Sequence, residues 1–142
     1  MTAIMQGIFP VLQTAVNDDD TLDIASLRKQ VDLCIEAGAH GLVYPVLGSE
    51  YQFLAQAERH EMAAVVVDQA SGRIPVVVGV AGADALEHAR HAATTRADAV
   101  IALPPNMSSG TRAQVIPTTG LSPPPSKYPS SSSTLPAAST SI

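Results

Sequence analysis

The sequence predicts an α/β fold in which parallel strands alternate with amphipathic helices. Two short runs, residues 74–80 and 97–103, are apolar on both faces, which is typical of strands in a parallel sheet covered by helices. Segments with helical apolar spacing separate the strands, so the order β-α-β-α-β-α-β extends from residue 7 to residue 103. Two architectures use this unit, the doubly wound open sheet and the (β/α)8 barrel, and periodicity alone does not separate them.

The first strand and helix are predicted from the segment that begins at Gly7. Residues 7–16 form an apolar run interrupted by Pro10, which indicates a strand with irregular geometry at the proline. The acidic residues 17–20 suit a turn, and Asp23 can cap the helix that follows. Gly38 is placed to end that helix in the left-handed conformation. The apolar stripe of the helix consists of Leu27, Val31, Cys34 and Ile35.

The next elements continue the alternation. Residues 40–46 form a short predicted strand, and a second helix is expected over roughly 55–70. The strand at 74–80 leads into a third helix over about 84–95, capped by its first aspartate, and the strand at 97–103 follows. The residues expected near one face of the second helix are Leu54, Met62, Val65, Val66 and Gln69.

Composition excludes several classes of protein. The 142 residues carry a net charge of −5, which leaves no basic face for nucleic acid. The single cysteine, Cys34, cannot form an internal disulfide, so a disulfide-stabilised secreted scaffold is excluded. No apolar run approaches the ~20 residues that span a bilayer. The N-terminal residues lack the features of a signal peptide, so we expect a soluble cytoplasmic protein.

The composition also predicts a boundary within the chain. All 13 acidic residues lie at or before Asp98, whereas residues 117–142 contain 6 Pro, 8 Ser and 4 Thr. Such a segment has little apolar surface to offset its ordering entropy. We therefore expect a folded domain over residues 1–106 and a disordered Pro/Ser/Thr-rich tail over 107–142. We hypothesise that this tail is a frameshift product, which the coding DNA beyond about residue 110, read in all frames, would test.

The best candidate for a binding site follows the second predicted strand. Gly48, Ser49 and Glu50 offer backbone amides, a hydroxyl and a carboxylate close together, at the strand end where both architectures place their chemistry. These groups can hold a substrate carboxylate. The alternative interpretation is that Gly48 only makes the turn and that Glu50 only lies near the next helix.

Other candidates have weaker support. His88 and His91, beside Glu87, have helical spacing for a metal pair, but no third ligand is evident, so we expect a solvated helix face and no metal. Residues 79–84, GVAGAD, could approach a phosphate but lack the complete dinucleotide-binding spacing. Cys34 is expected to pack in the core. No cofactor is predicted.

Five segments in order, GIFPVLQTAV, LDIASLRKQVDLCIEAGAHGLV, GSEYQFL-x-x-AER, GRIPVVVGVAG and ADAVIALPP, carry a family resemblance. Together they resemble the dihydrodipicolinate synthase/N-acetylneuraminate lyase family over residues 6–106. The resemblance implies a (β/α)8 barrel that binds a 2-oxo acid, commonly pyruvate, as a Schiff base on a lysine, without a cofactor. It further implies aldol-type addition or cleavage, or related dehydration, and a homo-oligomer for the intact family.

The family's signature after the second strand aligns with residues 46–50, and only Glu50 is kept. The two threonines that bind the keto-acid carboxylate in the family are Leu47 and Gly48 here, so Ser49 is the one hydroxyl available. The family's Pro-Tyr-Tyr after the fourth strand corresponds to residues 104–106, which have no tyrosine.

The Schiff-base lysine and the fifth-strand tyrosine of the family lie beyond the matched segments. The two lysines present, Lys29 on a helix and Lys127 in the tail, have no surroundings that would keep an amine neutral. We therefore expect the N-terminal half of a barrel in a truncated, inactive chain that is poorly folded or self-associating. The alternatives are a half-barrel module completed by another chain and a small doubly wound domain that binds phosphate.

Overall fold

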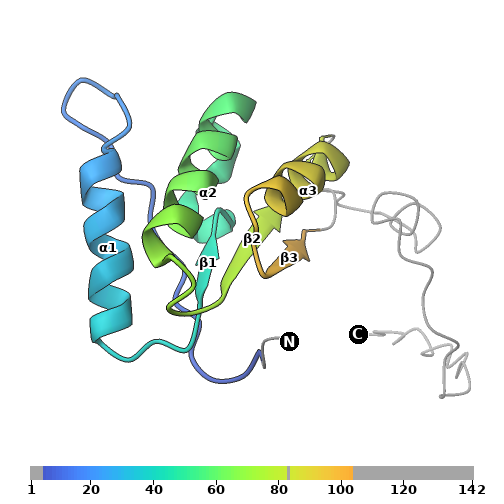
Figure 1. Cartoon of the computed structure of the whole chain (residues 1–142). Helices are drawn as coiled ribbons and strands as arrows, with labels where there is room; N and C mark the ends of the chain where they lie inside the picture. The colour runs from blue at the N-terminus through green and yellow to red at the C-terminus, as the bar shows by residue number, and fades with distance from the viewer. Residues whose placement is uncertain (1–4, 83, 104–142) are drawn as a thin grey trace, which may run out of the picture.

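The structure is a computed structural model that describes residues 5–82 and 84–103 (Figure 1). Within these residues, helices and parallel strands alternate as the sequence predicts. The helices are α1 (Ile24–Glu36), α2 (Gln56–Ala70) and α3 (Ala85–Thr94), and the strands are β1 (Leu42–Tyr44), β2 (Val76–Val80) and β3 (Ala99–Ala102). Two short 3-10 turns, η1 (Leu47–Ser49) and η2 (Tyr51–Phe53), lie between β1 and α2.

The described sheet is parallel, with the strands side by side in chain order, β1-β2-β3. Val43 pairs with Val77, and Val77 pairs with Ala99. The three helices lie next to one another on the same side of this sheet (Figure 1). A doubly wound sheet carries helices on both faces, whereas a barrel has its helices in an outer ring. The arrangement is therefore that of a partial (β/α)8 barrel, which confirms the predicted fold class.

The first predicted strand, residues 7–16, is reduced to an extended segment with a single bridge. Val11 pairs with Val43 in the parallel sense. The Leu12 N–H donates to the Val43 carbonyl at 3.1 Å, and the Val43 N–H donates to the Pro10 carbonyl at 3.0 Å. Because proline has no N–H, the ladder cannot continue regularly through residue 10. The segment nevertheless runs beside β1, where the first strand of a barrel belongs.

Helix α1 has the predicted signals at both ends. The Asp23 carboxylate accepts a hydrogen bond from the Ser26 N–H at 2.9 Å, which satisfies one of the free donors of the first turn. Gly38 follows the helix with φ +84°, a left-handed conformation that favours glycine. The predicted stripe faces inward, since Leu27 and Val31 are fully buried and Cys34 and Ile35 pack against the core.

The core lies between the helices and the sheet. It combines strand residues with the inward faces of all three helices, and fully burying one such side chain contributes about 1.5–3 kcal/mol. Its members are Leu12, Leu27, Val31, Leu42, Tyr44, Met62, Ala63, Val66, Ala70, Val76, Val78 and Ala92. Met62 and Val66 confirm the predicted inner face of α2.

Strand β3 differs from the buried strand that its apolar sequence predicts. Val100 is 49% exposed and Ile101 is 43% exposed. The reason is position, because β3 lies at one edge of the described sheet, where it pairs with β2 on one side. Apolar surface at a strand edge favours pairing with further strands.

Some sequence predictions lie outside the described residues. These are the tail over 107–142 and the segment at 104–106.

Asp84 stands at the start of α3 as predicted, although its side chain makes no capping hydrogen bond. Within the described part of the chain, no helix is both long enough and apolar enough to cross a membrane.

Candidate functional site

The candidate site is the connection between β1 and α2, at the carboxyl end of the sheet. After Tyr44 and a cis peptide bond to Pro45, the chain makes turn η1, passes through Glu50 in the left-handed conformation, and makes turn η2. The predicted residues Gly48, Ser49 and Glu50 lie within this connection. Because parallel strands end at the same edge of a sheet, the connection lies beside the end of the first extended segment.

Ser49 is completely buried and acts within the protein itself. Its Oγ donates a hydrogen bond to the Leu12 carbonyl at 2.6 Å and accepts one from the Val46 N–H at 3.2 Å. A serine hydroxyl has one proton, so this proton is already used. In this structure the hydroxyl ties η1 to the first extended segment and is not presented to solvent. Its role in substrate binding stays a prediction.

A second hydrogen-bond chain supports the same turn. The Thr14 hydroxyl donates to the Ser49 carbonyl at 2.6 Å and lies 3.0 Å from the Tyr44 hydroxyl. Because Thr14 has only one proton, Tyr44 must be the donor of the second bond. Burial raises the pKa of Tyr44, and the hydrogen bond with Thr14 opposes this rise. The phenol is therefore held neutral, as its donor role requires.

Sequence reasoning did not single out Thr14 and Tyr44. A usable signal exists, since each residue lies at the carboxyl end of an extended segment and the two segments are adjacent in a parallel arrangement. Hydroxyl-bearing residues at such positions meet at the same edge of the sheet. Only the register shows that they bond to each other.

Two glycines allow the backbone segments to approach closely. Gly48 is exposed, and a Cβ built there would lie 3.2 Å from Val11. A Cβ on Gly79 would overlap the carbonyl oxygen of Pro45, which is backbone and cannot move aside cheaply. Packing therefore explains why Gly79, the first glycine of GVAGAD, is a glycine: it allows β2 to contact the connection after β1.

Glu50 is exposed and faces a different environment from Ser49. It borders a cavity of about 170 Å³ at the carboxyl end of the first extended segment. The lining residues are Thr14, Val16, Asp20, Leu22, Glu50, Phe53, Leu54 and Glu58. Three of them are carboxylic acids, so the cavity repels the carboxylate of a ligand at neutral pH. The structure thus separates the three predicted residues into an exposed glycine, a buried hydroxyl and an acid at the edge of a cavity.

The expectation of a solvated helix face at His88 and His91 is wrong, because α3 turns both rings toward His60 on α2. His88 is only 5% exposed, and its Nδ1 lies 2.9 Å from Nε2 of His60. The rings of His60 and His91 stack with centroids 4.0 Å apart. We call His60, His88 and His91 the histidine cluster. Spacing on α3 alone could not reveal it, because His60 lies on another helix. Within the described residues, no group of His, Cys, Asp and Glu has a geometry that could hold a metal ion.

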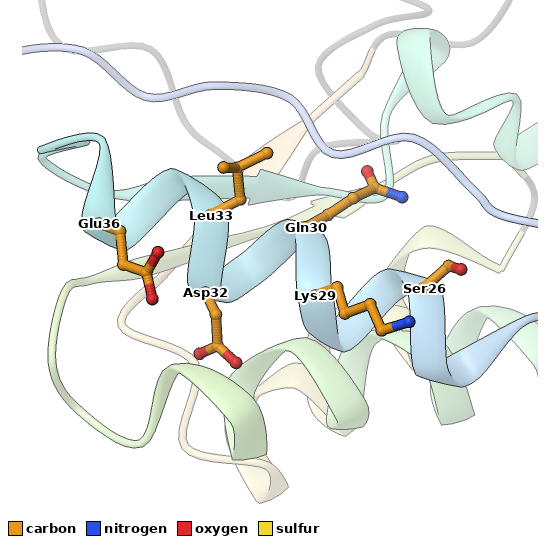
Figure 2. Close-up of a pocket in the computed structure, with 6 residues that line it drawn as sticks. All are labelled: Ser26, Lys29, Gln30, Asp32, Leu33 and Glu36. Atoms are coloured by element: carbon orange, nitrogen blue, oxygen red, sulfur yellow. The ribbon is translucent and has the colours of Figure 1, made fainter.

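Lys29 lies on the outer face of α1. It is exposed and borders a shallow depression whose other lining residues are Ser26, Gln30, Asp32, Leu33 and Glu36 (Figure 2). All six side chains come from this one helix, so no second element encloses the amine. Leu33 on the same surface is 65% exposed. The candidate site is on the connection after β1, a different part of the molecule.

Comparison with known proteins identifies the fold family. The dihydrodipicolinate synthetase family model matches residues 4–116, which extends beyond the boundary at 106 that composition suggests. A 4-hydroxy-tetrahydrodipicolinate synthase from Methylobacterium radiotolerans is 38% identical over 112 residues, covering 77% of this chain and 37% of that protein. An L-2-keto-3-deoxyarabonate dehydratase from Azospirillum brasilense is 37% identical over 73 residues, covering 51% of this chain and 24% of that protein.

Solved structures agree with this assignment. The crystal structure of YagE from Escherichia coli K12, a family member in complex with pyruvate, matches with a TM-score of 0.78 and 28% identity, covering 83% of this chain and 41% of that one. A dihydrodipicolinate synthase structure matches with a TM-score of 0.77 and 25% identity, covering 82% and 41%. The chain spans about a third of the length of the curated relatives that it matches. On its sequence, its half-barrel arrangement and these similarities, the chain belongs to the dihydrodipicolinate synthetase family.

Proposed function

We propose that this chain supplies the first half of an aldolase-type lyase site that takes a 2-oxo acid such as pyruvate. The observation that carries the proposal is the connection after β1, which the Ser49 and Thr14 hydroxyls fasten at the carboxyl end of the sheet. Catalytic groups of this fold lie on such connections. The solved relative YagE, which was crystallised with pyruvate, supports the substrate class.

The proposal gives each predicted residue a different task. Exposed Gly48 has no side chain of its own, so its backbone is where a substrate carboxylate can approach the turn. Buried Ser49 keeps the turn in shape through its bonds to Leu12 and Val46. Glu50 borders the acidic cavity, so it suits proton transfer or a hydroxyl-bearing part of the substrate better than a carboxylate.

We further propose that this chain alone forms no Schiff base. An amine must be neutral to attack a carbonyl, which requires desolvation or a nearby cation on a rigid frame. Lys29, the one lysine in the described residues, is exposed on α1 and no other element encloses it. The proposal therefore takes the reacting amine from the part of the relatives' barrel that this chain does not match.

Borohydride trapping tests both statements. The full chain is incubated with pyruvate and borohydride, and its intact mass is measured; we expect no adduct. A fusion of residues 1–103 to the second half of YagE should form the adduct. In that fusion, Ser49→Ala should lower the trapping rate roughly tenfold, since a lost buried hydrogen bond costs about 1–3 kcal/mol. The exposed loop residue Gln52, changed to Ala, is the matched control.

Two results would contradict the proposal. A stoichiometric adduct on the chain alone that disappears in Lys29→Ala would assign the amine to α1. A fusion that folds, shown by its near-ultraviolet circular dichroism, but forms no adduct would exclude pyruvate chemistry at this site.

A second candidate function is an assembly module completed by another chain. The observation that favours it is the apolar surface at the two sides of the described sheet. Val100 and Ile101 of β3 are about half exposed, and Ile8 beside β1 is 70% exposed. Closed barrels have no such edges. Size-exclusion chromatography of the full chain should show self-association, and a monomer with a cooperative melt would count against this candidate.

A further inference from the structure

The histidine cluster joins two helices through rings that contact one another directly. His60 comes from α2, and His88 and His91 come from α3. The His60 and His88 rings meet edge to face with centroids 4.9 Å apart, and the His60 and His91 rings are nearly parallel, with an interplanar angle of 6°. Arg59 of α2 lies at the other side of His88, with Nη1 at 3.4 Å from Nε2.

These contacts permit one consistent arrangement of protons. A guanidinium can only donate, so Nε2 of His88 must accept from Arg59 and carries no proton. Neutral His88 then carries its proton on Nδ1 and donates it to Nε2 of His60 at 2.9 Å. His60 in turn holds its proton on Nδ1. Both hydrogen bonds of His88, from Arg59 and to His60, therefore form when His60 and His88 are neutral.

Protonation of either bonded ring breaks this arrangement. A proton on Nε2 of His88 would face the guanidinium of Arg59, a donor against a donor and a cation against a cation. A proton on Nε2 of His60 would force His88 to accept at Nδ1 and to carry its own proton on Nε2, with the same result. Charge on His60 would also face the stacked His91 ring at 4.0 Å.

Arg59 connects this cluster to the candidate site. Its Nε donates to the Leu54 carbonyl at 3.3 Å, and its guanidinium lies 4.7 Å from the centroid of the Tyr51 ring. Tyr51 belongs to turn η2, and Leu54 follows it. One side chain thus holds α3, through His88, and the end of the connection after β1.

We propose that the histidine cluster and Arg59 form an acid-sensitive latch, which fastens α3 and turn η2 to α2 while the rings are neutral and opens when they are protonated. The latch does not depend on the proposed lyase activity, because its parts are helix contacts within the described residues. It would change the shape of the connection after β1 in response to pH, whatever that connection binds.

Burial and the strongest of the nearby charges favour the neutral form of the His88 and His91 rings in the folded chain. Burial lowers the pKa of His88, and the charges of His60 and Arg59 lower it further, against opposing effects of Asp84 and Glu87 on α3. Burial and then His60 lower the pKa of His91. Tyr51 is the titratable group that η2 contributes, and the strands β2 and β3 have no ionisable side chain.

The pH range in which the latch opens follows from the lowered pKa values of His88 and His91. A histidine whose pKa is lowered on folding binds its proton first in the unfolded or opened state. The stabilisation from the latch is therefore complete above the ordinary histidine value of 6.5 and is lost as the pH falls through the lowered value. The opened state gains about tenfold in relative population for each unit by which the pKa is lowered.

Imidazole titration in the full chain, followed by nuclear magnetic resonance, tests the latch. The chain has four histidines, and His40, whose Nδ1 accepts from the Ile8 N–H, lies outside the cluster. We expect His88 and His91 to titrate below the ordinary histidine value of 6.5. Arg59→Gln should raise the pKa of His88, whereas Arg90→Gln, which removes an exposed arginine from α3, the helix of His88, should leave it unchanged.

Hydrogen–deuterium exchange measures the opening itself. Between about pH 7.5 and pH 5.5, after correction for intrinsic exchange rates, peptides from α3 and η2 should lose protection and peptides from α1 should keep it. His60→Gln, which keeps an acceptor but cannot take up a proton, should reduce the loss, and His40→Asn should not. Titration of His88 and His91 at the ordinary histidine value, equal loss in α1 and α3, or no protection of α3 at neutral pH would each overturn the proposal.

Discussion

The two surfaces of α2 are held by different chemistry. Toward α1, arginines meet carboxylates: Arg28 of α1 lies 2.8 Å from Asp68, and Arg73, which follows the end of α2, lies 2.6 Å from Asp32 of α1. Gln69 links the two pairs, donating to Asp32 at 2.7 Å and accepting from Arg28 at 2.8 Å. Toward α3, the polar contact is the histidine cluster, with Arg59 as its cation. The same helix therefore has one contact that is charged at neutral pH and one that requires neutral rings.

This difference sets the pH range in which each contact stabilises the fold. The hydrogen bond from Arg73 lowers the pKa of Asp32, and Gln69 acts in the same direction. A carboxylate whose pKa is lowered on folding stabilises the folded state fully when the pH is above its ordinary pKa of 3.8. This stabilisation is lost as the pH falls through the lowered pKa. The contact between α1 and α2 should thus survive a fall in pH that opens the contact between α2 and α3.

The largest expected effect comes from the apolar part of the contact between α1 and α2. Leu27 is fully buried, so Leu27→Ala should lower the free energy of unfolding by about 2–5 kcal/mol. Leu33→Ala on the same helix removes a side chain that is 65% exposed, and it should change the free energy by less than about 0.5 kcal/mol. Urea denaturation followed by circular dichroism measures both. Equal effects would show that α1 does not pack as described.

Removing the central histidine tests the other side of α2. His88→Ala leaves His60 and Arg59 without their partner, and at about pH 7.5 it should cost about 1–3 kcal/mol. The cost should shrink at about pH 5.5, since the unaltered chain then has lost the same stabilisation. Urea midpoints at the two pH values give this comparison. A cost that does not change with pH would indicate simple packing at His88.

Acidification of the unaltered chain should separate the two contacts without any substitution. The urea midpoint should fall as the pH drops below 6.5, because the pKa values of His88 and His91 are lowered on folding. Asp68→Asn should leave this fall unchanged, since the carboxylate it removes lies on the opposite surface of α2. A midpoint constant down to about pH 5 would contradict the assignment.

The smallest effect is expected for the exposed ion pair. Asp68 is 70% exposed in its side chain, so Asp68→Ala should cost no more than about 1 kcal/mol, and the cost should fall at high salt. Asp18→Ala, which removes an exposed acid from the turn before α1, is the control for the change in net charge. A salt-independent loss well above this value would mean that the pair is more than a surface contact.

Much of the fold follows from local sequence. The cap at Asp23, the glycine at 38 and the inward stripe of α1 predict that helix almost to the residue, because each signal acts within one or two helical turns. The apolar run at 74–80 likewise predicts β2. The segment around Pro10 is less regular than predicted, because its pairing depends on which N–H groups meet β1.

The candidate site is predictable only in its position. The sequence placed Gly48, Ser49 and Glu50 at the carboxyl end of a strand, and they lie there. That Ser49 bonds to Leu12, and that Thr14 bonds to its carbonyl, depends on residues 35 to 37 positions apart in the chain. Spacing along one segment contains no information on such partners.

The sequence by itself determined the order of strands and helices, the capped ends of α1 and the family to which the chain belongs, because these depend on local spacing and on a series of matched segments. The tertiary structure decided that the helices share one side of the sheet, that Ser49 is buried, and that His60 meets His88 and His91. These facts arise from contacts between elements distant in the chain, and a histidine's surroundings, which determine its protonation, exist only once two helices pack together.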